Sequence, residues 1–333
     1  MIDNHDITVV VQGPVVASKD RSMDEGITEI CLASVRKFLP GARLILSTWK
    51  GQPVEGLDYD ELLLNDDPGS NVTEYNEKGE PDRSNNNRQI VSSRNGLALV
   101  KTRYAIKLRT DNYLAGDQFK ALQQAFPQRC DQDKFFLERV VVNNTFTRTY
   151  GKGSRVVFHL CDFFAFGRTE DVQALWSMDN LPDLEFDPSQ LGSKQYYGAP
   201  HYKIDCTQKL ALKALQGFDP KLNIAHLQDV SGDLIERCDR IYANNFVIGE
   251  PEIIGLGLCS KFGPQERANR LSGRLTYVNY DDWQVLYQRY CDATYDTKPA
   301  RLRLIKRNFL RFFLLFAKSV EEFGRSLKRK VKS

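Results

Sequence analysis

The stretch that most restricts the fold is ITVVV at residues 7–11, a continuous apolar run that stops at the turn-forming residues QGP at 12–14. Such a run is typical of a strand that is buried on both faces, as in a parallel sheet. Apolar residues at spacings of three and four then predict a helix over 27–38, and ARLILSTW predicts a second strand over 42–49. Strand, helix and parallel strand form the right-handed crossover unit of α/β proteins. The sequence therefore predicts a Rossmann-like α/β fold, with a mostly parallel, twisted sheet flanked by helices.

The same alternation continues along the chain, with no internal repeat or low-complexity segment. Residues 67–87 are polar and rich in Gly, Pro and Asn, so we expect a long surface loop there. The helix that starts at Thr169 is expected to open with a capping box. The other expected elements are strands near 61–66, 104–108, 135–142 and 155–167, extended segments within 240–258, and helices near 86–101, 116–126, 169–176, 204–216 and 281–292.

The net charge of +3 is unevenly distributed along the chain. Residues 299–333 contain 11 Lys and Arg against 2 Asp and Glu, a local charge of +9, so residues 1–298 carry −6. A mildly acidic body with a strongly basic tail indicates that the tail meets an anionic partner.

The tail also carries an apolar stripe at helical spacing, which predicts an amphipathic helix over 299–333. A Phe-rich face flanked by cations is typical of a helix that lies in the headgroup region of an anionic membrane. The alternative is a stripe that docks on the body, with the basic residues merely solvated. We predict the membrane surface as the partner, and no nucleic acid, because the body is acidic. The stripe comprises Leu302, Ile305, Phe309, Phe312, Phe316, Val320, Phe323 and Leu327.

The cysteines and the amino terminus bear on the compartment. Seven cysteines are scattered without a CxxC pair, which argues against a zinc ribbon or a thioredoxin-like site and is simplest for free thiols in a reducing cytosol. The first residues lack the basic and apolar segments of a cleavable signal, and no run reaches the roughly 20 apolar residues of a spanning helix. We therefore expect a cytoplasmic protein that is peripheral on the inner face of the inner membrane.

Polar residues follow the predicted strands where each one ends. They are Gln12, Gly13 and Pro14, then TWK at 48–50, and then Arg109, Thr110, Asp111 and Asn112. In an open parallel sheet, ligands bind beyond the carboxyl ends of the strands, near the point where the strand order reverses. The glycine-rich patterns of dinucleotide and ATP sites are absent, so a phosphate cradle of those kinds is not expected.

Asp111 has two interpretations. A carboxylate at a strand end can coordinate Mg²⁺ or Mn²⁺, and such a cation can neutralise a diphosphate leaving group. Alternatively, Asp and Asn form a plain turn at this point. Upstream, Arg88 and Arg94 lie on the predicted helix before this strand and could offer planar donors to phosphate oxygens, although each could instead face solvent.

These segments support a resemblance to a known family. ITVVVQGPV, LILSTWKGQ, NDDPG, NNNRQIVSSRNGL, AIKLRTDN and FHLCDFFAFG together resemble the WavE family of bacterial lipopolysaccharide-synthesis proteins, over roughly residues 7–175. Segment 86–112 also resembles the D-x-D passage of inverting glycosyltransferases of the GT-A fold. The resemblance implies that Gln12 and Gly13 line a nucleotide pocket and that Arg88 and Arg94 approach the donor sugar. It implies that Asp111 replaces the last acid of D-x-D and holds a divalent cation, although this chain has one acid there instead of two.

An inverting transfer requires a general base that deprotonates the acceptor hydroxyl. Asp205, at the start of the helix at 204–216, and Asp162, within an apolar strand, are the candidates. Asp205 could instead be a plain N-cap. Asp162 is costly to bury unless it faces the site or pairs with an arginine. His159 and His201 are weaker candidates, because a single His in such a context is more often a core residue.

We interpret the chain as a glycosyltransferase of lipopolysaccharide synthesis that moves a sugar from a nucleotide-sugar donor to a lipid-linked oligosaccharide. Residues 1–298 would form a single GT-A-like catalytic domain, with a nucleotide-binding half at 1–115 and an acceptor half at 116–298. Two alternatives remain open. One is a sugar nucleotidyltransferase, and the other is a non-catalytic, membrane-associated factor of glycan assembly.

Overall fold

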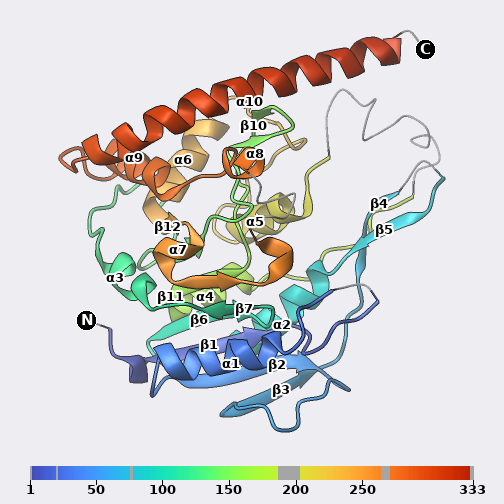
Figure 1. Ribbon diagram of the computed structural model, residues 1–333, viewed down its shortest axis with the longest axis vertical. Coiled ribbons are helices and arrows are strands. Elements are labelled where there is room, and N and C mark those ends of the chain that lie inside the picture. Colours follow the sequence, from blue (N-terminus) through green and yellow to red (C-terminus); the bar gives the residue numbers. More distant parts are fainter. Residues whose placement is uncertain (1, 20–21, 76–77, 187–202, 264–270, 331–333) are drawn as a thin grey trace.

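A seven-stranded sheet forms the centre of the computed structural model, which describes residues 2–19, 22–75, 78–186, 203–263 and 271–330 (Figure 1). In chain order its strands are β1 (Ile7–Gln12), β2 (Arg43–Trp49), β3 (Glu61–Asn65), β6 (Tyr104–Arg109), β8 (Val140–Asn143), β11 (Phe164–Arg168) and β12 (Phe246–Gly249). Their order in the sheet is β12-β8-β11-β6-β1-β2-β3. β11 runs antiparallel to both of its neighbours, and all other neighbouring strands are parallel. The predicted mostly parallel α/β sheet is therefore confirmed.

Helices flank this sheet on both sides. The helices of the described residues are α1 (Ile27–Phe38), α2 (Asn86–Ala98), α3 (Gln118–Gln124), α4 (Thr169–Trp176), α5 (Cys206–Gln216), α6 (Leu234–Asn245), α7 (Pro251–Ile254), α8 (Leu271–Arg274), α9 (Tyr280–Tyr290) and α10 (Lys298–Lys330), with short 3-10 helices η1 (Asn4–Asp6) and η3 (Ser260–Phe262). α1 carries the chain outward from β1 to β2, and α2 carries it back from β3 to β6. Because crossovers between parallel strands are right-handed, α1 and α2 lie on opposite faces of the sheet.

The strand order reverses between β1 and β6. The chain leaves β1 towards β2 and leaves β6 towards β8, on the other side. The parallel register places Gln12, the last residue of β1, opposite Arg109, the last residue of β6. All six residues of β1 are buried, as its continuous apolar run predicts. The two carboxyl ends therefore open a crevice at the position where α/β sheets bind ligands.

Helix α2 packs very closely on β1 and β2. The Oγ of Ser47 in β2 donates a hydrogen bond to the carbonyl oxygen of Ser92 at 2.8 Å. One turn later, Gly96 leaves no room for a side chain, because a Cβ atom there would lie 2.5 Å from Cγ1 of Val10 and 2.9 Å from Cβ of Ser47. This close approach brings the start of α2 to the carboxyl ends of the strands.

The structure differs from the expected elements in several places. The expected loop at 67–87 contains a hairpin of β4 (Asn71–Tyr75) and β5 (Pro81–Ser84), which projects beside the sheet in Figure 1. The expected extended segments within 240–258 include the end of α6. The expected capping box at Thr169 was wrong: the N-cap is Arg168, and the Thr169 hydroxyl instead donates to the carbonyl oxygen of Thr102 at 2.7 Å.

The expected strand at 155–167 is broken in the middle. β9 (Tyr150–Gly151) pairs with β10 (Ser154–Arg155), and the chain becomes extended again at β11. Between them, Phe158 adopts a left-handed backbone with φ of 53°, which interrupts an extended strand. The short strands β7 (Asn112–Leu114) and β13 (Leu256–Leu258) also pair, outside the central sheet. The local sequence does not predict this pairing, because the two strands lie far apart along the chain.

Helix α10 is the long C-terminal helix that the apolar stripe predicts. It lies across one end of the molecule, next to α9 (Figure 1). Among the helices of the described residues, none is both long and apolar enough to cross a membrane.

Replacing Gly96 by Ala is expected to lower the free energy of unfolding by about 1–3 kcal/mol, because the added methyl group pushes α2 away from β1 and β2. Urea denaturation measures this loss. Gly324→Ala in α10 is the control, since no atom lies within 4 Å of its would-be Cβ, and it should be unchanged or slightly more stable. Equal stability of Gly96→Ala and the parent would contradict the close packing of α2.

Candidate functional site

A cavity of about 360 Å³ lies at the carboxyl ends of β1, β2 and β6, beside the start of α2. Of the site residues expected from the sequence, it brings together Gln12, Gly13, Pro14, Arg88 and Arg109. Its other lining residues are Ser18, Trp49, Gln52, Asp67, Ser84, Asn85, Asn86, Gln89, Ser92, Cys206 and Lys261. The lining residues come from distant parts of the chain, which the reversal of strand order places side by side.

Gln12 and Gly13 form the floor of this cavity where β1 ends. Gly13 has φ of 126°, and a Cβ atom there would lie 2.8 Å from Oγ1 of Thr110, so both the backbone and the space require glycine. The Oε1 of Gln12 accepts a hydrogen bond from Oγ of Ser92 at 2.6 Å. The amide nitrogen is therefore the end of the Gln12 side chain that can donate to a ligand.

Arg88 reaches the cavity from the first turn of α2. Its Nε and Nη2 donate to the two carboxylate oxygens of Asp67, both at 2.8 Å, and its Nη1 donates to Oδ1 of Asn85 at 2.7 Å. The hydrogen bond from Arg88 lowers the pKa of Asp67. These bonds hold the guanidinium plane in one orientation at the cavity wall.

Asp111 lies behind the cavity, completely buried between two cationic side chains. Nε and Nη2 of Arg109 donate to its two oxygens, each at 2.9 Å, and Nζ of Lys261 lies 3.0 Å from Oδ2. Burial alone would lower the pKa of Arg109, but the charges of Asp111 and Asp162 raise it above its ordinary value.

The surroundings of Asp111 do not fit a divalent cation. Both of its oxygens are occupied by cationic donors, so a metal bound there would face two positive charges at close range. In the described part of the chain, no group of three His, Cys, Asp or Glu side chains is arranged to hold a metal ion. Whether the protein requires a divalent cation stays a prediction.

Arg94 and Asn112 do not line the cavity. Nη1 of Arg94 donates to the carbonyl oxygen of Met178 at 3.0 Å, on the side of α2 that faces the segment after α4. Asn112 is fully buried at the start of β7, which pairs with β13. The structure therefore separates these two residues from Gln12, Gly13 and Arg88.

Asp162 lies next to the cavity and has the arginine partner that an acid in this apolar segment requires. Its Oδ2 is 3.4 Å from Nη1 of Arg109 and accepts a hydrogen bond from the side chain of Gln89. Its carbonyl oxygen accepts from Nζ of Lys107. Burial lowers the pKa of Lys107 to about 7, against the opposing charge of Asp162. Asp162 thus contacts two residues that line the cavity, Arg109 and Gln89.

Asp205 is the N-cap of α5, where its Oδ1 accepts from the backbone N–H of Gln208 at 2.9 Å. Its Oδ2 also lies 2.6 Å from Nε2 of His159, which is almost fully buried. Burial would raise the pKa of Asp205, but the charge and hydrogen bond of His159 lower it to about 2. A carboxylate with so low a pKa is a weak proton acceptor at neutral pH. His201 lies outside the described residues.

Lys261 and Asp67 are the charged cavity residues that the sequence did not predict. Lys261 lies in η3, in the unremarkable segment CSKFG, and reaches the site only because β13 pairs with β7. Asp67 lies in the segment expected to be a loop, with Asp66 and Pro68 on either side. Only contacts across the folded chain identify these two residues.

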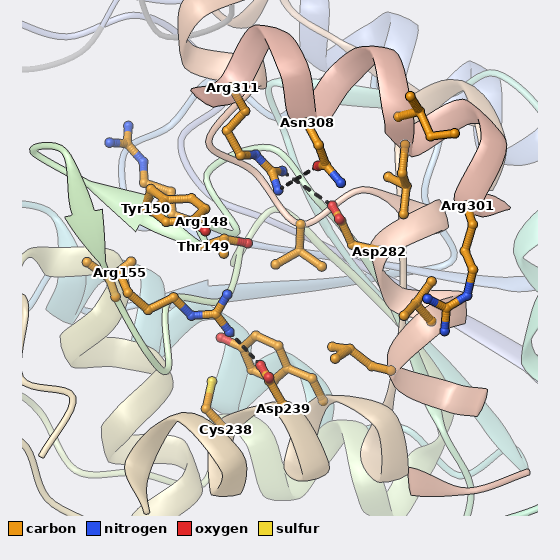
Figure 2. A pocket seen from close by; sticks show the side chains of 17 residues that line it. Arg148, Thr149, Tyr150, Arg155, Cys238, Asp239, Asp282, Arg301, Asn308 and Arg311 are labelled. Carbon is orange, nitrogen blue, oxygen red and sulfur yellow. Dashed lines mark hydrogen bonds and ion pairs between the residues drawn. The ribbon is translucent and has the colours of Figure 1, made fainter. Parts of the chain in front are cut away.

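A second cavity, of about 390 Å³, lies under α10 (Figure 2). Arg155 reaches into it from β10 and pairs with Asp239 of α6 at 2.6 Å, while Arg311 of α10 lies 3.5 Å from Asp282 of α9. Burial raises the pKa of Asp239, and its contact with Arg155 opposes this shift. These charged groups pair with one another, so the cavity is better understood as the polar junction that holds α10 on the body.

The contacts of α10 show how this junction works. The buried Arg311 donates from Nε to the carbonyl oxygen of Leu275 at 2.6 Å and from Nη2 to that of Tyr277 at 3.2 Å. Arg307 donates to Asp282 through Nη2. The inner face of α10 is therefore held largely by arginines, which leaves its apolar stripe on the outside.

Asp205→Asn is expected to lose about 1 kcal/mol of stability at pH 7, since Asn keeps the helix cap but removes the charge next to His159. The pKa of Asp205 is lowered by folding, so its contribution is present above about pH 4, the ordinary Asp value. The difference between variant and parent should therefore shrink as the pH falls towards 2, which urea denaturation at several pH values measures.

Asp117→Asn is the matched control, because Asp117 is an N-cap whose side chain makes no capping bond. It should change stability by less than about 0.5 kcal/mol. An Asp205→Asn loss of the same size at pH 7 and near pH 2 would show that the charge is not its source.

Several solved structures show remote similarity to the chain. A 4-diphosphocytidyl-2C-methyl-D-erythritol synthase from Anaerococcus prevotii is 13% identical, with a TM-score of 0.30, over 66% of this chain and 99% of that chain. HddC from Yersinia pseudotuberculosis is 11% identical, with a TM-score of 0.30, over 56% of this chain and 86% of that chain. Its complex with GMP-PN has a TM-score of 0.27 at 11% identity, over 52% of this chain and 79% of that chain. No curated protein matches the chain.

The match to a family is much more extensive. The family model described as WavE lipopolysaccharide synthesis matches residues 7–313, which include the central sheet, all residues that line the strand-end cavity and the first half of α10. The resemblance seen in the sequence is therefore confirmed, and it extends well beyond residue 175. The chain belongs to the WavE family of lipopolysaccharide synthesis.

Proposed function

We propose that this protein transfers a sugar from a nucleotide-sugar to a lipid-linked glycan during lipopolysaccharide synthesis. The observation that carries the proposal is the convergence of Gln12, Gly13, Arg88, Arg109 and Lys261 on one cavity at the point where the strand order reverses. This is the position at which open α/β sheets bind nucleotides. Membership of the family places the protein in lipopolysaccharide synthesis, and the cavity supports a nucleotide-sugar as the donor.

The chemistry of the cavity suits a nucleotide with phosphates. Gln12 and the glycine backbone at Gly13 provide a polar donor and a close approach for a flat ring. Three cations, Arg88, Arg109 and Lys261, line the same space together with one acid, Asp67. Charge-assisted hydrogen bonds from such donors bind phosphate oxygens.

We assign the general base to Asp162 in preference to Asp205. Asp162 contacts Gln89 and Arg109, which both line the cavity. Asp205 has its carboxylate committed to the α5 cap and to His159, and its pKa is lowered to about 2. A base that takes a proton from an acceptor hydroxyl must lie beside the site.

The exposed apolar face of α10 supports the proposal that the acceptor is bound to a membrane. Seven residues of the predicted stripe are more than half exposed, among them Phe309, Phe312 and Phe316 at 62–65%, and the side chain of Leu327 lies outside the described part. Large contiguous apolar patches on a protein surface mark interaction sites. The flanking Lys and Arg give segment 299–333 a charge of +9, which complements an anionic bilayer surface. We therefore propose that α10 lies in the headgroup region of an anionic membrane, with the arginines of its inner face on the body.

At least one of the UDP-, GDP- and CMP-sugars is expected to bind and to raise the melting temperature, since a ligand of the native state stabilises it. Arg88→Gln should weaken this binding at least tenfold, which isothermal titration calorimetry measures, because it removes a charged donor from the cavity wall. Arg43→Gln is the matched control, as Arg43 pairs with a carboxylate of Glu61 at 2.6 Å away from the cavity.

Three outcomes would oppose the proposal. No binding of any nucleotide-sugar would favour a non-catalytic assembly factor. Pyrophosphate release from a nucleoside triphosphate and a sugar phosphate would favour a nucleotidyltransferase. Equal losses for Arg88→Gln and Arg43→Gln would separate nucleotide binding from this cavity.

The triple variant Phe309→Ser, Phe312→Ser, Phe316→Ser is expected to reduce binding to phosphatidylglycerol-containing vesicles at least tenfold, because each Phe contributes apolar area to the buried face. Co-sedimentation measures the bound fraction, and vesicles of phosphatidylcholine alone should bind the parent weakly. Leu137→Ser, at a residue 62% exposed on the body, is the control and should bind like the parent. Unchanged binding of the triple variant would exclude α10 as the membrane surface.

A further inference from the structure

The acid that resembles a metal ligand does not face the ligand cavity. Asp111 is fully buried and is not among the residues that line the space, whereas its two cationic partners, Arg109 and Lys261, are. The guanidinium of Arg109 occupies both carboxylate oxygens, and Nζ of Lys261 shares Oδ2. The carboxylate thus holds two fixed cations at the cavity wall, at the position where D-x-D proteins present an acid to a metal.

We infer that Arg109 and Lys261 neutralise the phosphates of the donor in place of a divalent cation, and that Asp111 positions them. The inference rests on the proposed function and names the groups that stabilise its leaving nucleotide. In this inference Asp111 binds the two cationic side chains, whereas the sequence resemblance implies that it binds a divalent cation.

Arg109 is held rigidly enough for this role. Its guanidinium carbon lies 4.4 Å from the ring centre of Phe163 and 5.4 Å from that of Phe262, so aromatic rings pack against the charged group. Asp111 fixes one edge of the guanidinium and Asp162 lies at 3.4 Å from Nη1. A preorganised charge of this kind stabilises developing negative charge without reorganisation.

Lys261 is anchored through its own segment. Its Nζ donates to the carbonyl oxygen of Ser22 at 3.0 Å, in addition to its contact with Asp111. The neighbouring Ser260 donates its backbone N–H to Asp24 at 2.7 Å, and its hydroxyl also bonds to that carboxylate. The hydrogen bonds from Ser260 lower the pKa of Asp24. These contacts bring the ammonium group of η3 to the strand-end cavity.

The reaction requires positive charge at this place. The acceptor hydroxyl oxygen bonds to the anomeric carbon, its proton passes to the base, and the bond between the anomeric carbon and the phosphate oxygen breaks. The electron pair of that bond remains on the departing nucleotide, which gains negative charge on its phosphate. Arg109 and Lys261 lie on the cavity wall and can stabilise that charge, which is the duty of a metal in metal-dependent transfer.

The test is nucleotide binding to the full chain, measured by calorimetry in EDTA and again with added Mg²⁺ or Mn²⁺. UDP, GDP and CMP are the probes. We expect the nucleotide that binds to have an affinity in EDTA within about threefold of that with metal. Lys261→Gln should weaken its binding at least tenfold in EDTA, leave the affinity for the corresponding nucleoside unchanged, and be rescued by Lys261→Arg.

Lys50→Gln is the matched control, because Lys50 pairs with Asp66 at 2.6 Å near the end of β2 but does not line the cavity. It should bind like the parent, and melting temperatures should show that all variants fold. Binding that is lost in EDTA and restored by metal, or binding that Lys261→Gln leaves unchanged, would overturn the inference while leaving the proposed function intact. Failure of every nucleotide and nucleotide-sugar to bind, with or without metal, would reject both.

Discussion

The parallel pairing of β1 with β6 is the constraint on which the site depends. Its register aligns Gln12 with Arg109, so that the two chain segments diverge from adjacent strand ends. Gly13 can make the turn after β1 only because it lacks a Cβ atom, which would contact Thr110 of the neighbouring segment. α2 reaches the same edge because Gly96 allows it to lie directly on Val10 and Ser47. Two glycines and one strand pairing therefore define the cavity.

The buried charges around this edge follow from the same geometry. A buried carboxylate is strongly unfavourable unless cationic donors compensate it, so Asp111 requires Arg109 and Lys261 as much as they require it. Asp162 lies on the other side of Arg109. Acids and cations therefore alternate along this series, and its two cations, Arg109 and Lys261, line the cavity. The proposed phosphate site is thus built around an acid that does not itself line the cavity.

Helix α10 reverses the usual arrangement of an amphipathic helix. Such helices normally bury their apolar stripe against the protein core. Here the buried side carries Arg311, which donates to two carbonyl oxygens, and the contact of Arg307 with Asp282, next to the buried Leu304, while Phe309 and Phe316 remain exposed. Exposure of this much apolar surface costs free energy in water and marks an interaction site. The polar junction under α10 sets its orientation, and the proposed membrane surface accounts for its outer face.

The sequence alone determined the sheet and the glycine-bearing strand ends, because continuous apolar runs and helical periodicity are local signals of burial. ITVVV, ARLILSTW and YAIKL predicted β1, β2 and β6, and the apolar stripe predicted α10. The polar residues after these strands predicted Gln12, Gly13 and Arg109 as cavity residues. The break at Phe158 was missed, since a left-handed residue inside an apolar run carries no pattern.

Only the tertiary structure decided what the charged residues contact. Lys261 and Asp67 reach the cavity, Arg94 does not, and Asp205 is committed to His159 as well as to its helix. An ion pair depends on the distance between two side chains from separate segments, and composition and spacing do not encode that distance. The hydrophobic pattern of a strand is local and can be read from its own residues, whereas the partner of a buried acid is chosen by the fold.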